Sequence, residues 1–187
     1  MAGILKGKTV AILATDGFEE AELAEPKKAL EHADATIHII APQMGEIKGW
    51  KSADWGRVAK VTRDLNEVSF EDYDALMLPG GVINADKLRT DMRAVQFARK
   101  FFEAGRPVAA ICHASWLLIE ADVVRGRTMT SWPSLQTDLR NAGANWIDEQ
   151  VVVDGNLVTS RKPDDLPAFN KRMIEMFAAS SRLAQTA

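Results

Sequence analysis

The 187-residue sequence has a single cysteine, Cys112, so no disulfide can form within the chain. This cysteine usage fits the reducing environment of the cytoplasm, where we expect the protein to reside. The sequence also lacks any apolar stretch close to the roughly 20 residues that cross a bilayer, so we expect no membrane association. Residues 1–14 hold a short apolar run without the cleavage pattern of a secretory signal, and a first strand explains this run better.

Positive charge is not in excess either, since the chain has 23 Lys and Arg against 26 Asp and Glu, which gives a net charge of −3 at pH 7. Without a broad positive field, we do not expect nucleic acid as a partner. The three histidines, His32, His38 and His113, do not have the spacing of metal ligands, and there is no cysteine cluster. We therefore expect neither a metal nor another cofactor.

The composition is that of an ordinary globular chain, with 47% hydrophobic and 26% charged residues. A chain of 187 residues is long enough for one well-packed domain and too short for two ordinary ones. We find no internal repeat, low-complexity segment or linker. The sequence thus predicts a single domain over residues 1–187.

Four short apolar runs have the character of parallel strands buried on both faces, and they occupy residues 8–14, 36–41, 74–78 and 107–111. Residues 19–33 and 91–104 between them are helix-like, and Pro26 either kinks the first helix or divides it. Because each parallel crossover needs a covering helix, this alternation predicts an α/β fold. Its flavodoxin-like, doubly wound and mostly parallel sheet carries helices on both faces.

Two segments predict antiparallel pairing. Residues 45–65 alternate and are punctuated by glycine, which indicates a small hairpin excursion outside the main sheet. In residues 150–160, the turn sequence Asp154-Gly155-Asn156 separates two strand-like runs and is a good hairpin signal. Residues 163–177 then carry apolar side chains at helical spacing, so we expect a closing helix.

The most informative stretch is residues 106–120, RPVAAICHASWLLIE. A strand is expected to end at Ile111 and a helix to begin directly after Cys112. So abrupt a turn strains the backbone and requires small residues two positions away, which Ala110 and Ala114 provide. The start of a helix would also lower the pKa of the Cys112 thiol and favour the thiolate. The alternative is that Cys112 is simply a small buried apolar residue, as most lone cysteines are.

Two further loops follow strands at the same edge of the predicted sheet. Gly80 and Gly81 let backbone N–H groups turn inward, where such groups can stabilise an oxyanion, although Pro-Gly-Gly is also a common turn. In the loop at residues 16–20, Glu19 approaches the Cys112 sulfur, or else Glu19 and Glu20 only stabilise the first turn of a helix. Doubly wound sheets place ligands at the carboxyl ends of strands, so we expect the three loops to converge on one crevice.

Taken together, these motifs resemble those of the PfpI-like intracellular proteases and glyoxalases of the ThiJ/PfpI superfamily, which has a class I glutamine amidotransferase-like fold. The resemblance rests on FEEAEL, LMLPGG, AICHAS and a later segment that begins GRTMTSWPSLQTDLRNAGANWIDE, and it covers nearly the whole chain in order. A glutamine amidotransferase itself would need a downstream histidine paired with an acid. No histidine follows His113, so that triad cannot be built.

The resemblance implies a role for each matching residue. Cys112 is the nucleophile, His113 is its adjacent histidine, Glu19 is the glutamate that hydrogen-bonds the cysteine, and the backbone amides of Gly81 and His113 form the oxyanion hole. In PfpI-like proteases an acidic residue of a neighbouring subunit orients the histidine, and Asp86 is the closest match. The resemblance therefore implies a homodimer or higher homo-oligomer with the site near a subunit interface.

Two kinds of function are consistent with these residues. In a stress-response enzyme, Cys112 attacks a small carbonyl compound, as in glyoxalases and deglycases, or a peptide, as in a cysteine protease or amidase, while Glu19 or His113 transfers protons. In a non-enzymatic oxidative-stress sensor, scavenger or chaperone, an exposed low-pKa thiolate is oxidised by peroxide, and no second cysteine can trap it as a disulfide.

The five tryptophans are spread through the chain without forming one stripe, so packing in the core and at interfaces is the simplest interpretation. Trp116 lies one turn after the cysteine and is expected to wall the pocket. Trp50 and Trp55 lie in the predicted hairpin excursion and are candidates for a dimer contact.

Overall fold

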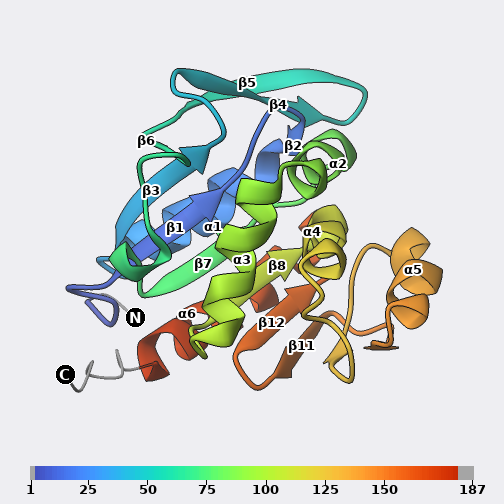
Figure 1. Cartoon of the computed structure of the whole chain (residues 1–187). Coiled ribbons are helices and arrows are strands. Elements are labelled where there is room, and N and C mark those ends of the chain that lie inside the picture. Colours follow the sequence, from blue (N-terminus) through green and yellow to red (C-terminus); the bar gives the residue numbers. More distant parts are fainter. Residues whose placement is uncertain (1–2, 181–187) are drawn as a thin grey trace.

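The main sheet organises the molecule, and the computed structural model describes residues 3–180 of the chain. Within this range seven strands pair in the order β11-β12-β8-β7-β1-β3-β6 (Figure 1). All neighbours are parallel except β11 and β12, so the mostly parallel, doubly wound sheet is confirmed. These strands are β1 (Thr9–Leu13), β3 (Thr36–Ala41), β6 (Arg63–Asp64), β7 (Ala75–Leu78), β8 (Val108–Ile111), β11 (Val151–Asp154) and β12 (Leu157–Ser160).

Helices cover both faces of this sheet, as the alternation of elements predicts. In Figure 1, α3 and α4 lie in front of the strands, while α1 and α6 lie behind them. None of the helices in residues 3–180 has the length and apolar character required to cross a membrane. The helices are α1 (Glu20–His32), α2 (Val82–Thr90), α3 (Met92–Glu103), α4 (Ser115–Glu120), α5 (Gln136–Asn141) and α6 (Leu166–Ala179).

The apolar runs bury both of their faces because successive side chains of a strand point in opposite directions. In β1, Val10 and Ile12 belong to the core under α1 and α6, whereas Ala11 and Leu13 belong to the core under α3 and α4. All four are fully buried. Burying an aliphatic side chain of this size contributes about 1.5–3 kcal/mol, which explains why such short strands hold the centre of the fold.

Two local predictions for the helices can be compared with the structure. The closing helix is present as α6, whose buried side chains include Phe169 and Phe177. Helix α1 continues through Pro26, so the proline neither divides it nor starts a second piece. The helix α2, which starts directly after Gly81, has no counterpart in the sequence-based expectations.

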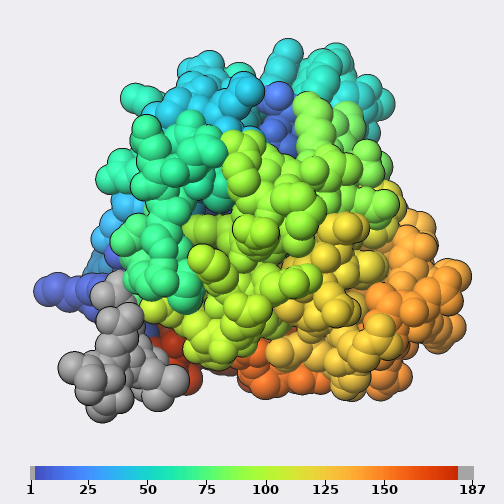
Figure 2. Space-filling model, viewed as in Figure 1, coloured from blue at the N-terminus to red at the C-terminus, as the bar shows by residue number. Residues whose placement is uncertain are grey.

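The predicted hairpin excursion is confirmed as a separate three-stranded sheet, in the order β2-β4-β5. Strands β4 (Glu46–Lys51) and β5 (Asp54–Lys60) are antiparallel, and β2 (Phe18–Glu19) pairs with β4. The expected range extended too far, because β6 at its end joins the main sheet beside β3. Figure 2 shows the cyan hairpin above the green surface of α2 and α3, with the yellow and orange segment of α4 and α5 on their other side.

The second predicted hairpin is also present, with its turn at Gly155 and Asn156 between β11 and β12. Strand β12 pairs with β8 in parallel and so attaches this hairpin to the main sheet. A further two-stranded sheet joins β9 (Thr128–Met129) and β10 (Asn145–Trp146), which precede and follow α5 in the chain.

The topology also fixes where a ligand can bind. Strands β1 and β7 are neighbours, but the chain leaves β1 towards β3 on one side and leaves β7 towards β8 on the other. A crevice opens outside the carboxyl ends of two such strands, and it is the usual ligand site of doubly wound sheets. The loops after β1, β7 and β8 meet at this edge.

Candidate active site

Cys112 lies on a strained turn at the end of β8. Its φ angle is +62°, in the left-handed region that costs a residue with a side chain roughly 1–2 kcal/mol. The predicted strain at this position is therefore confirmed. The chain continues through a 3-10 turn, Cys112–Ala114, into the six-residue helix α4, where the sequence had predicted a helix that begins at once. Ala110 and Ala114 are both buried beside the turn.

The carboxyl group that contacts the cysteine belongs to Glu22, whereas the sequence analysis had assigned this contact to Glu19. The Glu22 side chain is 0% exposed and hydrogen-bonds the Cys112 thiol. Its Oε2 accepts a hydrogen bond from the Gly80 N–H at 2.9 Å. Glu19 precedes the first residue of α1, and its partly exposed side chain lines the cavity instead.

A sequence signal for Glu22 was available in the spacing of α1. Glu22, Pro26 and Leu30 follow one another at intervals of four residues, and all three are buried. Residues spaced in this way share one face of a helix. The face that enters the core could thus have been identified, and with it the third glutamate of FEEAEL.

Burial dominates the protonation of this pair. It raises the pKa of Glu22 to about 8, and the nearby charge of Glu19 adds to the effect, while hydrogen bonds from Cys112 and the Gly80 N–H oppose it. The Oε1 atom of Glu22 has no hydrogen-bond partner among the described residues, so no donor stabilises a negative charge there. Glu22 is therefore largely protonated at neutral pH.

The predicted lowering of the Cys112 pKa is wrong. Burial and the Glu22 carboxylate raise the pKa of the thiol, and the hydrogen bonds that the Gly81 and His113 amides donate to the sulfur do not offset them. The side chain is only 6% exposed, and the helix that follows is short and begins after a 3-10 turn. Desolvation consequently exceeds any effect of the helix dipole.

The two glycines after β7 are required by the close approach of three loops. Gly81 has a φ of +88°, and a Cβ there would collide with the carbonyl oxygen of Gly17 and lie 2.6 Å from the Glu19 nitrogen. A Cβ on Gly80 would collide with Glu22 and lie 2.6 Å from the Cβ of Cys112. The absence of side chains lets the Gly81 N–H reach the sulfur, where it can also meet an oxygen anion.

His113 is the second titratable group beside the sulfur, and its Nδ1 lies 3.2 Å from the Cys112 Sγ. Trp116 packs against the imidazole edge to face at 5.2 Å between centroids, and Trp132 stacks on it at 5.9 Å. Burial lowers the pKa of His113 to about 4, so the ring is neutral at neutral pH. With its proton on Nε2, the ring can accept the thiol proton at Nδ1.

Asp86 lies on α2 and is not brought to the cysteine within this chain. Its side chain is 65% exposed, and its Oδ1 lies 3.7 Å from the Nε of Arg89 one turn later. Because only one chain is present, the expected contact between Asp86 of a neighbouring subunit and His113 stays a prediction.

A cavity of about 560 Å³ opens above the cysteine. Glu19, Glu22, Cys112 and His113 reach it from the sheet edge, and the aromatic side chains of the wall were not anticipated at this place. Trp50, a candidate for a dimer contact, lines the cavity from the hairpin, and Trp132 does so in place of the predicted Trp116. The other lining residues are Gly17, Ser52, Gly81, Val82, Ile83 and Pro163.

Within residues 3–180, no group of three or more His, Cys, Asp or Glu side chains is arranged to hold a metal ion. The reactive groups of the chain that reach the cavity are the thiol, the two carboxyl groups, the imidazole and the inward-facing amides. Such a set can form and break a covalent bond to sulfur while moving a proton and stabilising an oxygen anion.

The fold and site together define a structural class, a doubly wound α/β sheet with a cysteine on a strained strand-to-helix turn beside a buried glutamate. The chain belongs to the DJ-1/PfpI family, whose family model matches residues 8–176.

Relatives support this assignment along almost the whole chain. Protein/nucleic acid deglycase 2 of Escherichia coli is 45% identical, over 92% of this chain and 99% of the relative. General stress protein 18 of Bacillus subtilis is 41% identical, over 91% and 98%. The crystal structure of Drosophila melanogaster DJ-1beta matches with a TM-score of 0.84 and 26% identity, over 97% of this chain and 94% of that one.

The close approach at Gly81 can be separated from its backbone conformation by two alanine variants. Gly105 has a φ of +65° and open space where a Cβ would lie, so Gly105→Ala should cost only the conformational strain of about 1–2 kcal/mol. Gly81→Ala adds collisions with three backbone atoms, and we expect it to lower the free energy of unfolding clearly more and to slow alkylation of Cys112. Urea unfolding and iodoacetamide labelling measure both effects; equal losses in the two variants would contradict the requirement for glycine.

The buried Glu22 carboxyl should make stability depend on pH. Its pKa rises from 4.5 in the unfolded chain to about 8 in the folded protein, so the folded state binds this proton more tightly. The resulting stability is fully present below pH 4.5 and is lost as the pH rises through 8.

Between pH 5 and 8 we therefore expect the free energy of unfolding of the wild type to fall relative to Glu22→Gln, by at most about 1.4 kcal/mol per pH unit. Urea unfolding at three pH values measures this difference. Glu25→Gln, an exposed change on the same helix, should follow the wild type. Parallel profiles for the wild type and Glu22→Gln would show that the carboxyl does not retain its proton.

Proposed function

We propose that this protein is a PfpI-type stress enzyme that uses Cys112 to convert reactive carbonyl compounds, as glyoxalases and deglycases do. The observation that carries the proposal is the position of the sulfur, which lies on a strained turn, borders the cavity, and is contacted by a protonatable carboxyl, an imidazole and two amides. The names of the relatives from Escherichia coli and Bacillus subtilis, a deglycase and a general stress protein, support the same function.

The chemistry starts with addition of the sulfur to an aldehyde carbon. The thiol proton passes to His113 Nδ1, and the new oxygen anion is stabilised by the Gly81 and His113 amides before it is protonated. If the aldehyde is already bound to an amino group as a hemiaminal, that amine leaves from the same carbon as the carbon–sulfur bond forms.

An internal redox step completes the reaction of an α-dicarbonyl compound. A proton leaves the carbon bound to sulfur and a proton arrives at the neighbouring carbonyl carbon, so the first carbon is oxidised and the second reduced. Water then hydrolyses the thioester, which releases a 2-hydroxy acid and restores the thiol. The wild-type protein would thus convert methylglyoxal and one water into lactate without an external oxidant.

The raised pKa of Cys112 favours this enzymatic role over a peroxide sensor. A sensor needs a thiolate that is ionised before its target arrives, whereas an enzyme can transfer the thiol proton as the substrate binds. A chain with a single cysteine forms no internal disulfide and is suited to a reducing compartment. We therefore propose that the protein works in the cytoplasm.

We further propose that the working form is a homo-oligomer in which Asp86 of one copy orients His113 of another. The neutral imidazole needs its proton on Nε2 to accept at Nδ1, and a carboxylate hydrogen-bonded to Nε2–H would fix that tautomer. Asp86 is exposed enough to serve a second copy, since its only described ionic partner is Arg89 at 3.7 Å on its own helix.

Replacement of the sulfur tests the main proposal. Cys112→Ala should reduce the conversion of methylglyoxal to lactate, and the release of amines from methylglyoxal adducts, by at least about a thousandfold, because no covalent intermediate can form. Thermal unfolding confirms that the variant is folded, and a peptide amide substrate measured in parallel detects hydrolase activity. Conversion at the wild-type rate by Cys112→Ala would eliminate the proposal, and turnover of the peptide alone would replace it with a protease.

The oligomer can be tested by a matched pair of amide variants. Asp86→Asn should reduce kcat about ten- to a hundredfold, because the imidazole loses its orienting carboxylate, while sedimentation shows the same assembly as the wild type. Asp122→Asn, at another exposed position, should keep kcat unchanged. A monomeric wild type, or an assembled Asp86→Asn with normal kcat, would refute the role of Asp86.

A further inference from the structure

Glu19 is an acidic side chain in the cavity wall that the proposed chemistry does not use. It is partly exposed, and its carboxyl keeps contact with water, unlike the fully buried Glu22. Burial and Glu20 raise the pKa of Glu19. The charged form of Glu19 acts on its neighbours, since it is one cause of the raised pKa of Glu22, and it places a negative charge in the cavity that Cys112 also lines.

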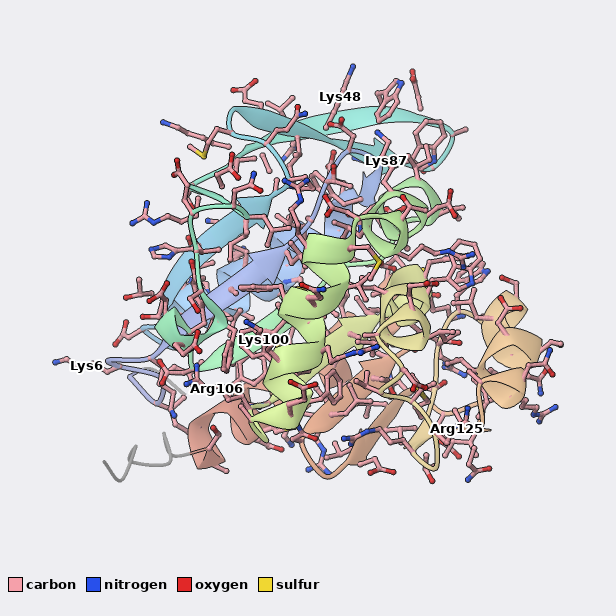
Figure 3. All side chains as sticks on the ribbon, in the orientation of Figure 1. Lys6, Lys48, Lys87, Lys100, Arg106 and Arg125 are labelled. Carbon is pink, nitrogen blue, oxygen red and sulfur yellow. The ribbon has the colours of Figure 1, made fainter. Side chains whose placement is uncertain are left out.

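No basic side chain balances this charge among the described residues that line the cavity. Figure 3 labels Lys48 and Lys87 near the hairpin, while Lys6, Lys100, Arg106 and Arg125 lie elsewhere on the molecule. Four basic residues of the surrounding elements have acidic partners of their own within 4 Å, while Lys48 lies over the Trp55 ring, 5.5 Å from its centroid. These pairs are Lys51 and Arg57 with Glu20, Lys87 with Asp16, and Arg89 with Asp86.

The walls of the cavity strengthen the effect of the charge. Trp50 and Trp132 stand on different elements around the opening, and Val82 and Ile83 add apolar surface. Apolar walls reduce screening by water, so a charge acts over a longer distance than it does on an open surface. Aromatic faces also attract cations and offer nothing to a carboxylate.

We propose that Glu19 selects the substrates of this site by charge. Uncharged aldehydes and carbonyl adducts on the cationic side chains of arginine or lysine are admitted, and compounds that carry a carboxylate beside the reactive carbon are rejected. The choice of substrate class rests on the proposed carbonyl chemistry. Because the product of that chemistry is a carboxylate, the same charge favours release of the product.

The charge effect can be measured without enzymatic turnover, by alkylation of Cys112. Iodoacetamide and iodoacetate have similar size and lose the same iodide, but only iodoacetate is an anion. The ratio of their rate constants cancels any change in the ionisation of the thiol, because both reagents react with the same sulfur. N-acetylcysteine in the same buffer provides the intrinsic ratio.

We expect the wild type to prefer iodoacetamide more strongly than N-acetylcysteine does. Glu19→Gln should lower this preference about three- to tenfold, and added salt should lower it in the wild type. Glu25→Gln removes the same charge from an exposed position of α1 and should leave the ratio within about twofold of the wild type. Equal ratios in the wild type and Glu19→Gln, with both proteins folded by thermal unfolding, would overturn the proposal.

A second measurement connects the charge to the proposed reaction. If the protein converts methylglyoxal, lactate should inhibit Glu19→Gln at a concentration several-fold lower than it inhibits the wild type, and unchanged inhibition would contradict the role in product release. If the protein does not convert methylglyoxal, the reaction itself has been assigned wrongly, yet the alkylation ratio still decides whether Glu19 selects by charge.

Discussion

The hydrogen bond from the Gly80 N–H to the buried Glu22 carboxyl is the interaction on which the site depends. It joins the loop after β7 to the first turns of α1, and the same carboxyl contacts the thiol at the end of β8. Three connections that are far apart in sequence therefore meet at one side chain. A charge at this depth would be costly to desolvate, and protonation of Glu22 removes that cost while keeping the contact to the sulfur.

The surroundings of the thiol hold protons in place until a substrate arrives. Burial keeps Glu22 protonated and His113 neutral, and it also disfavours a free thiolate. Inward-facing amides are nevertheless positioned at the sulfur, where they can stabilise negative charge as it develops. An environment of this kind favours ionisation that is coupled to bond formation over a permanently charged sulfur.

Local patterns were sufficient to predict much of the fold and part of the site. Apolar runs located the central strands, Asp154-Gly155-Asn156 located a hairpin, and the abrupt turn with its small residues indicated the strained backbone of Cys112. These features depend on residues that are close in sequence. The structure adds the order in which the seven strands of the main sheet pair.

The errors concern quantities that depend on tertiary packing. The sign of the Cys112 pKa shift follows from how deeply the turn is buried, which the sequence around it does not specify. The choice between Glu19 and Glu22 depends on which face of α1 meets the core. Trp50 reaches the cavity because the hairpin folds back over the sheet edge, a contact between segments separated by about 60 residues.

The cavity is lined from two separate sheets, of which only the main sheet carries the cysteine. The strand β8 of the main sheet positions the sulfur, whereas the hairpin contributes Trp50 from β4 and Ser52 from its turn. Within residues 3–180 this hairpin pairs only with the short β2. Amino-acid substitutions in this hairpin can change the shape of the cavity opening without disturbing β8, the strand that positions Cys112. Homologous proteins with the same reactive groups could thus differ in ligand specificity through substitutions in this segment of some fifteen residues.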